Sequence, residues 1–105
     1  MGKTVYNKLV RDKIPEIIQA NHQTCICEVL SDDAYLQKLN EKLNEECKEY
    51  QEDKSIEELA DILEVLYAIA SARGSTVKEL EQMRLNKAAQ RGGFQKKLLL
   101  KEVDG

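Results

Sequence analysis

Two consecutive stretches of the sequence, residues 32–53 and 56–73, repeat their apolar side chains with the period of an α-helix. Ser31 offers N-cap chemistry to the first stretch, and a capping box opens on Ser55 at the start of the second. Gly74 stands where a helix commonly ends. This pattern predicts two long helices in direct succession, which is difficult to reconcile with a fold built from strands.

Each of these helices is expected to bury one apolar face. The first face consists of Leu36, Leu39, Leu43, Cys47 and Tyr50. The second consists of Leu59, Ile62, Leu63, Leu66, Ile69 and Ala70, widened by Val65, Ala68 and Ala72. An apolar arc this wide needs cover from more than one neighbouring helix.

The remaining segments are shorter. Residues 10–21 are expected to form a short helix or turn broken near Pro15, and residues 76–90 a further helix stopped by glycines. Residues 24–30 alternate and are β-prone, so they predict a strand that pairs with the tail, residues 94–103. The expected fold class is therefore all-α for the most part, with one small two-stranded pairing.

The composition agrees with one helical domain over residues 1–105, since 33% of the residues are charged and only 5% are aromatic. No apolar run is long enough for a membrane span, and no signal-peptide core is present, so a cytoplasmic protein is expected. Three cysteines form no disulfide framework. Cys25 and Cys27 with His22 lack the second pair that a tetrahedral metal site needs.

The charges are segregated along the chain. Residues 41–64 hold ten of the nineteen acids, whereas residues 84–101 hold six bases and no acid. An acidic centre between basic ends does not predict a nucleic-acid-binding surface, which is expected to be broadly positive. It fits a ligand that is itself a metal–polyphosphate complex.

Four acids fall inside the apolar arcs of the two central helices, as Glu46 and Glu49 on the first and Glu58 and Asp61 on the second. Glu45 is expected to point outward. Like charges one helical turn apart cost roughly 0.2–0.5 kcal/mol per pair, and partial burial adds a desolvation cost. A hard cation such as Mg²⁺ would offset both costs. The alternative is that these acids are simply solvated, as is common in helices rich in Glu and Lys.

The same acids carry a family resemblance. Glu45-Glu46-Cys47-Lys48-Glu49, followed by Glu58-Leu59-Ala60-Asp61, resembles the EExxE…ExxD pattern of the all-α NTP pyrophosphatase superfamily. That superfamily includes MazG-like proteins, dimeric dUTPases and phosphoribosyl-ATP pyrophosphohydrolases. The opening Tyr6-Asn7-Lys8-Leu9-Val10-Arg11-Asp12-Lys13-Ile14-Pro15 resembles that of a small housecleaning-type branch, and Lys87…Arg91-Gly92-Gly93-Phe94 resembles its C-terminal segment.

The resemblance implies a magnesium-dependent enzyme, with Mn²⁺ as a substitute metal, that splits the α–β phosphoanhydride of a nucleotide into monophosphate and pyrophosphate. The implied metal ligands are Glu46, Glu49, Glu58 and Asp61, and the implied catalytic residues are Glu46 and Glu49. One of the four ligands, with Glu49 as a candidate, would also orient the attacking water, and the sequence does not choose among them. The family's four-helix arrangement is completed between subunits, so a homodimer or homotetramer is expected.

Basic residues at both ends are candidates for substrate phosphate, because guanidinium and ammonium groups suit phosphate oxygens. The candidates are Lys8, Arg11, Lys13, Lys87 and Arg91, with Asn86 as an amide contact. The alternative is that they are surface residues or partners of nearby acids.

Other functions stay open at this point. A ferritin-like di-iron protein needs Glu-x-x-His pairs, and the single histidine, His22, is far from every acid pair. A non-catalytic helical regulatory module has the same spacing as an active enzyme. A phosphoribosyl-ATP pyrophosphohydrolase is a third alternative, which the N-terminal segment disfavours.

Overall fold

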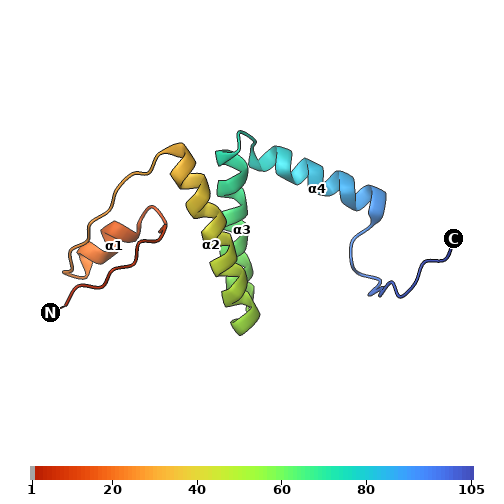
Figure 1. Cartoon of the computed structure of the whole chain (residues 1–105), viewed down its shortest axis with the longest axis horizontal. Coiled ribbons are helices and arrows are strands. Elements are labelled where there is room, and N and C mark those ends of the chain that lie inside the picture. Colours follow the sequence, from red (N-terminus) through yellow and green to blue (C-terminus); the bar gives the residue numbers. More distant parts are fainter. Residues whose placement is uncertain (1) are drawn as a thin grey trace.

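The computed structural model describes residues 2–105, and over that range the chain is helical without a strand. The helices are α1 (Ile14–Ala20), α2 (Asp32–Asp53), α3 (Ile56–Ala72) and α4 (Val77–Arg91). Figure 1 shows α2 and α3 side by side at the centre, with α1 on one side and α4 on the other. The all-α prediction is therefore confirmed.

Side-chain caps fix where three of the helices begin. The Ser31 hydroxyl accepts the Ala34 N–H at 3.2 Å, and the Thr76 hydroxyl accepts the Glu79 N–H at 3.0 Å. The Ser55 hydroxyl likewise accepts the Glu58 N–H at 3.3 Å. Each bond satisfies a backbone donor that the first helical turn leaves without a partner.

The ends of α2 and α3 use two different turns. Gly74 has φ +84°, and the N–H groups of Gly74 and Ser75 return to the carbonyls of Ser71 and Ala70. This is a Schellman motif, in which glycine adopts the left-handed conformation at little cost. At the end of α2 the left-handed position falls on Lys54, with φ 58°. The two-residue connection Lys54–Ser55 then starts α3 antiparallel to α2.

The facing surfaces of α2 and α3 form a seam that changes character along its length. Leu39 on α2 and Val65 on α3 are the buried apolar side chains of the described residues. Toward one end, Tyr35 and Ala68 line a hollow of about 270 Å³. Toward the other end, near the α2–α3 turn, the seam is acidic and contains the buried Glu46.

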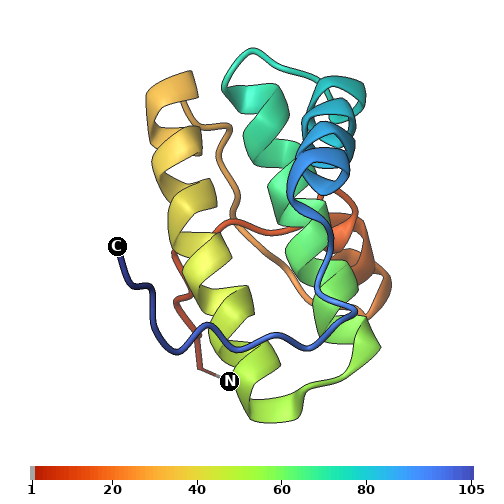
Figure 2. The ribbon, with the colours of Figure 1, turned by 90° about the vertical axis from the view of Figure 1, so that its right-hand side faces the viewer.

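The face of α3 that the sequence marks as its main apolar surface is only partly covered. Leu59, Leu63 and Leu66 remain 42%, 44% and 36% exposed, because α3 packs on α2 through its Val65 edge. Cys47 is also exposed, contrary to its expected place in the apolar face of α2. The N-terminal end of α4 contacts α3, and the rest of α4 projects away from the α2–α3 pair (Figures 1 and 2).

The molecule is consequently extended. Its principal dimensions are 65 × 31 × 24 Å, and its radius of gyration is 18.5 Å. A compact domain of this length has a radius of gyration of about 13 Å. One chain therefore leaves much of its apolar surface facing solvent.

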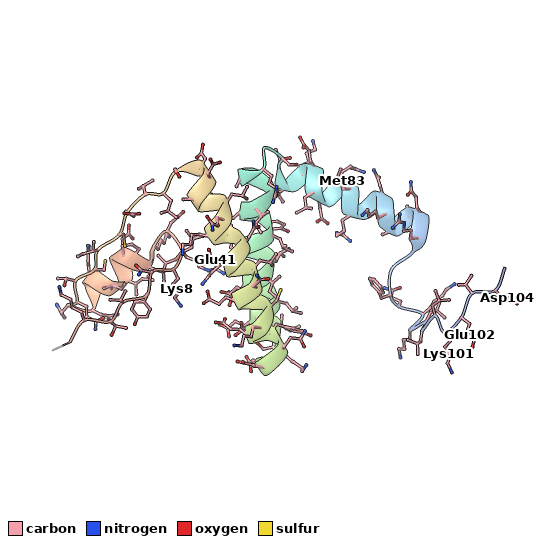
Figure 3. The ribbon with its side chains drawn as sticks, viewed as in Figure 1. Lys8, Glu41, Met83, Lys101, Glu102 and Asp104 are labelled. Carbon is pink, nitrogen blue, oxygen red and sulfur yellow. The ribbon has the colours of Figure 1, made fainter. Side chains whose placement is uncertain are left out.

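The predicted strand pair is wrong for this chain. Residues 24–30 and 94–103 belong to no strand, and they lie on opposite sides of the α2–α3 pair (Figure 1). Ile26 and Phe94 are both 99% exposed. Figure 3 shows Lys101, Glu102 and Asp104 on a tail that lies clear of the helices. The alternation of residues 24–30 fits a strand, but the α2–α3 pair lies between this segment and the tail.

Pro15 also behaves differently from the expectation. It stands in the first turn of α1, where its missing N–H removes no helical bond, so it starts the helix and does not break it. Among residues 2–105, no helix is long and apolar enough to cross a membrane.

Candidate metal centre

The acidic end of the α2–α3 seam brings together carboxylates from both helices. One oxygen each of Glu46, Glu58 and Asp61 lies within 4.8 Å of the others. A second group joins Glu46 to Glu45 and Glu49 within the same limit. Glu46 belongs to both groups, so the four predicted ligands form one continuous acid centre. The helical spacing explains it, since residues three apart share a face of each helix.

Burial makes this centre unlike an ordinary acidic surface. Glu46 is only 7% exposed, as the one buried charged residue in the described chain. Its Oε2 atom and the Oε2 atom of Glu58 are both buried and accept no hydrogen bond from residues 2–105. Buried polar atoms in proteins are nearly always satisfied, by protein, water or an ion. Two orphaned carboxylate oxygens across one seam therefore indicate a place for a cation.

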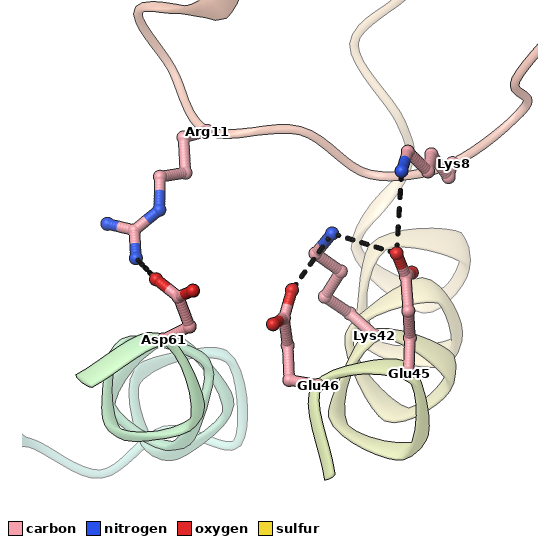
Figure 4. A network of polar contacts seen from close by, with 6 residues as sticks. All are labelled: Lys8, Arg11, Lys42, Glu45, Glu46 and Asp61. Carbon is pink, nitrogen blue, oxygen red and sulfur yellow. Dashed lines mark hydrogen bonds and ion pairs between the residues drawn. The ribbon is translucent and has the colours of Figure 1, made fainter. Parts of the chain in front are cut away.

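Three basic side chains contact the rim of the acid centre (Figure 4). Lys42 lies 3.2 Å from Glu46 and 3.5 Å from Glu45, one helical turn away on α2. The other two come from the extended segment before α1. Lys8 lies 3.4 Å from Glu45, and the Arg11 guanidinium donates to Asp61 at 2.8 Å.

Glu49 and Glu58 receive no such partner among the described residues, and the pKa values of both carboxyls are raised. The pKa of Glu49 rises chiefly through hydrogen bonding to Glu46, a bond that forms only when one of the two carboxyls is protonated. The negative charge of Glu46 and desolvation add to this effect. Desolvation is the main cause at Glu58, followed by the charge of Asp61. Both groups thus resist holding a negative charge in the absence of added positive charge.

Glu45 was expected to point outward into solvent, and that expectation is wrong. Its side chain is 33% exposed and lies beneath Lys8, within the second acid group. A helical wheel of α2 considers only helix neighbours, whereas the cover here comes from a segment without regular structure. Lys42 was not singled out from the sequence, although its spacing to Glu46, four residues on, is a known ion-pair spacing.

The basic candidates divide into two sets. Lys8 and Arg11 reach the acid centre. Lys13 is the exposed N-cap residue of α1, and the described chain gives it no ion pair. Asn86, Lys87 and Arg91 lie on the exposed surface of α4, where Asn86 accepts a hydrogen bond from Gln82 at 3.0 Å. One chain does not bring these α4 residues to the acids, so their role in substrate binding stays a prediction.

The chemistry of the donor set fits a hard divalent cation. All candidate ligands are carboxylate oxygens, which Mg²⁺ prefers together with water and phosphate. The cysteines offer no competing soft site at this place, because Cys25, Cys27 and Cys47 are free and lie outside both acid groups. The acid groups can therefore hold a metal ion.

Comparisons with known proteins are sparse. A protein of Mycolicibacterium smegmatis, described only as uncharacterised, is 50% identical over 42 residues. The matched region is 40% of this chain and 43% of that protein, so the chain spans less than half the length of this relative. No family model matches, and no solved structure matches. The resemblance to the all-α NTP pyrophosphatases thus stays a prediction from the motifs.

Proposed function

We propose that this protein is a Mg²⁺-dependent nucleoside triphosphate pyrophosphohydrolase that cleaves the α–β phosphoanhydride to give a monophosphate and pyrophosphate. The observation that carries the proposal is the pair of orphaned, buried oxygens on Glu46 and Glu58, within a centre of four inward acids. Surface acids alone would not support it. The motif resemblance supplies the reaction, and the geometry supports the metal.

Each acid has a distinct part in this proposal. Glu46, Glu49, Glu58 and Asp61 would hold the cation, with Mn²⁺ able to replace Mg²⁺. Bound there, the cation would offset the negative charge of the phosphate chain and of the reacting phosphoryl group. Among these acids we assign the role of base to Glu49. It would take one proton of the attacking water while the bond between the α and β phosphates breaks and pyrophosphate leaves.

The proposed biological class is housecleaning of the nucleotide pool, acting on surplus or damaged nucleotides. The test is a panel of standard and modified triphosphates with Mg²⁺, with phosphoribosyl-ATP in one arm, scored for both pyrophosphate and single phosphate. Pyrophosphate release is expected, lost in Glu49→Gln and retained in Glu57→Gln, whose side chain is exposed on the same turn as Glu58. Stepwise loss of single phosphates would contradict the proposed reaction. No hydrolysis of any compound would favour a non-catalytic module.

We further propose that the enzyme works as a homodimer or homotetramer. The exposed parts of Leu59, Leu63 and Leu66 together amount to a little more than one whole leucine. Covering that surface is worth about 2–4 kcal/mol per copy. The extended shape of the single chain, with a radius of gyration of 18.5 Å, also supports completion of the fold by a second chain.

Light scattering at about 50 μM tests this assembly, because at that concentration an association free energy of about 6 kcal/mol or more keeps most chains assembled. A mass of two or four chains is expected, and Leu63→Glu should reduce it to one chain. Glu64→Gln on the polar side of α3 is the matched control. A wild-type protein with the mass of one chain at that concentration would contradict the assembly.

A further inference from the structure

Ion pairs and hydrogen bonds hold the segment that brings Lys8 and Arg11 to the acid centre. We call residues 7–11 the basic strap. It crosses over α2 and α3, as Figure 4 shows, and Lys38 donates to its Asn7 carbonyl at 3.4 Å. At its end the strap runs directly into α1, where the Arg11 carbonyl accepts the Ile14 N–H at 3.0 Å. Of its apolar residues, Val10 is exposed and Leu9 is only half-buried.

Arg11 occupies a position that conflicts with a filled metal centre. Its guanidinium contacts Oδ1 of Asp61, and Asp61 belongs to the same acid group as Glu46 and Glu58. A divalent cation in that group would stand close to the guanidinium, and like charges across a short distance repel. The Arg11 side chain is 58% exposed, so it can leave Asp61 without moving out of a buried core.

Lys8 differs in a way that matters for the outcome. It contacts Glu45, which lies in the second acid group and outside the trio of Glu46, Glu58 and Asp61. The Lys8 contact and the Asn7 carbonyl can therefore persist while Arg11 moves. The strap would stay over the centre with one guanidinium set free above it.

We propose that Arg11 is an internal counter-ion for Asp61 that a divalent cation displaces, and that the released guanidinium then binds the phosphate chain of the substrate. A planar guanidinium donates two parallel hydrogen bonds to phosphate oxygens as it does to a carboxylate, so phosphate is as suitable a partner for Arg11 as Asp61 is. The strap thus links filling of the metal centre to substrate binding. This inference rests on the proposed function, because it needs the acid centre to bind Mg²⁺.

The experiment measures Mg²⁺ binding without nucleotide, by calorimetry at low salt, on the full chain. Arg11→Gln should bind Mg²⁺ roughly two- to fivefold more tightly than wild type, the scale expected for losing a partly exposed ion pair. Lys3→Gln is the charge-matched control and should change little, since Lys3 is exposed and outside the strap. In the wild type, the Arg11 Nε–Hε NMR signal, assigned by its absence from Arg11→Gln, should shift as Mg²⁺ is added.

A second measurement separates this role from a merely structural one. In saturating Mg²⁺, Arg11→Gln should bind a non-hydrolysable triphosphate analogue more weakly than wild type does. Tighter metal binding with weaker nucleotide binding supports the displacement, whereas a structural role would weaken both. If wild type binds Mg²⁺ and Arg11→Gln binds it equally or more weakly, the inference is overturned while the proposed function stands. If neither protein binds Mg²⁺, the proposed function falls and the inference falls with it.

Discussion

The response of the folded protein to Mg²⁺, with and without Glu58, gives the sharpest test of the acid centre. In wild type, free Mg²⁺ at 100 times its dissociation constant should raise the free energy of unfolding by about 2.7 kcal/mol. For a domain of this size, that corresponds to an increase in melting temperature of about 10–20 °C. The gain arises because the folded chain gathers carboxylates that the unfolded chain disperses.

Replacing Glu58 by Gln removes one ligand and one negative charge while keeping the shape of the side chain. Without metal the variant should melt at the wild-type temperature or above it, because the Glu58 carboxylate is desolvated and faces Asp61 and Glu46. If the substitution weakens Mg²⁺ binding about 100-fold, the same Mg²⁺ concentration raises the melting temperature by only about 2–3 °C.

The assay is thermal unfolding followed by circular dichroism, in EDTA and in Mg²⁺, at one ionic strength. Glu57→Gln is the matched control, since it removes the same charge from the adjacent exposed position of α3. It should keep the full wild-type response. If Mg²⁺ shifts all three proteins equally, or if Glu58→Gln melts well below wild type in EDTA, the four acids do not form a shared metal site.

The structure also determines the direction in which three further changes should alter the stability of the protein. Metal-free stability should rise as the pH falls from 7 toward the ordinary carboxyl pKa of 4.5, because the raised pKa values of Glu49 and Glu58 make the folded state bind more protons than the unfolded state in that window. Urea unfolding at pH 7, 6 and 5 measures this change, and a flat or falling stability would count against repulsion among the acids. Leu39→Ala should lower the free energy of unfolding by about 2–5 kcal/mol because Leu39 is 2% exposed, whereas Leu63→Ala should lower it by less than 2 kcal/mol in a dilute single chain. Equal decreases, measured by urea unfolding, would be inconsistent with the described packing. Lys54→Gly should stabilise the protein by about 1 kcal/mol, since φ 58° suits glycine better than lysine, and an unchanged melting temperature would argue against strain at that turn.

The helices could be predicted from the sequence because their signals are local. Ser31 and Ser55 cap the helices that the periodicity marks, and Gly74 ends α3 in the left-handed conformation. Their effects act within one or two turns, so a single sequence contains the information. The inward direction of Glu46 and Asp61 could be predicted for the same reason, because the helical repeat determines which face of the helix each residue occupies.

Apart from Lys42, the site features that sequence reasoning missed depend on distant segments. Glu45 is covered by Lys8, which is 37 residues away in the sequence, and no helical repeat encodes that contact. The pairing of Arg11 with Asp61 spans 50 residues. The strand prediction for residues 24–30 failed because β-propensity reports suitability for a sheet, whereas a partner strand must be supplied by the rest of the fold.

The two-residue turn between α2 and α3 has a consequence for how the acid centre arises in time. Glu46 through Asp61 are close neighbours in sequence, so the centre closes through local contacts, which form early and fast in folding. Residues 32–72 leave the ribosome before α4 and the tail, and this hairpin contains every acid of the centre. If the centre binds the proposed cation, the nascent hairpin can bind it while α4 is still being synthesised, so that metal binding precedes the proposed assembly.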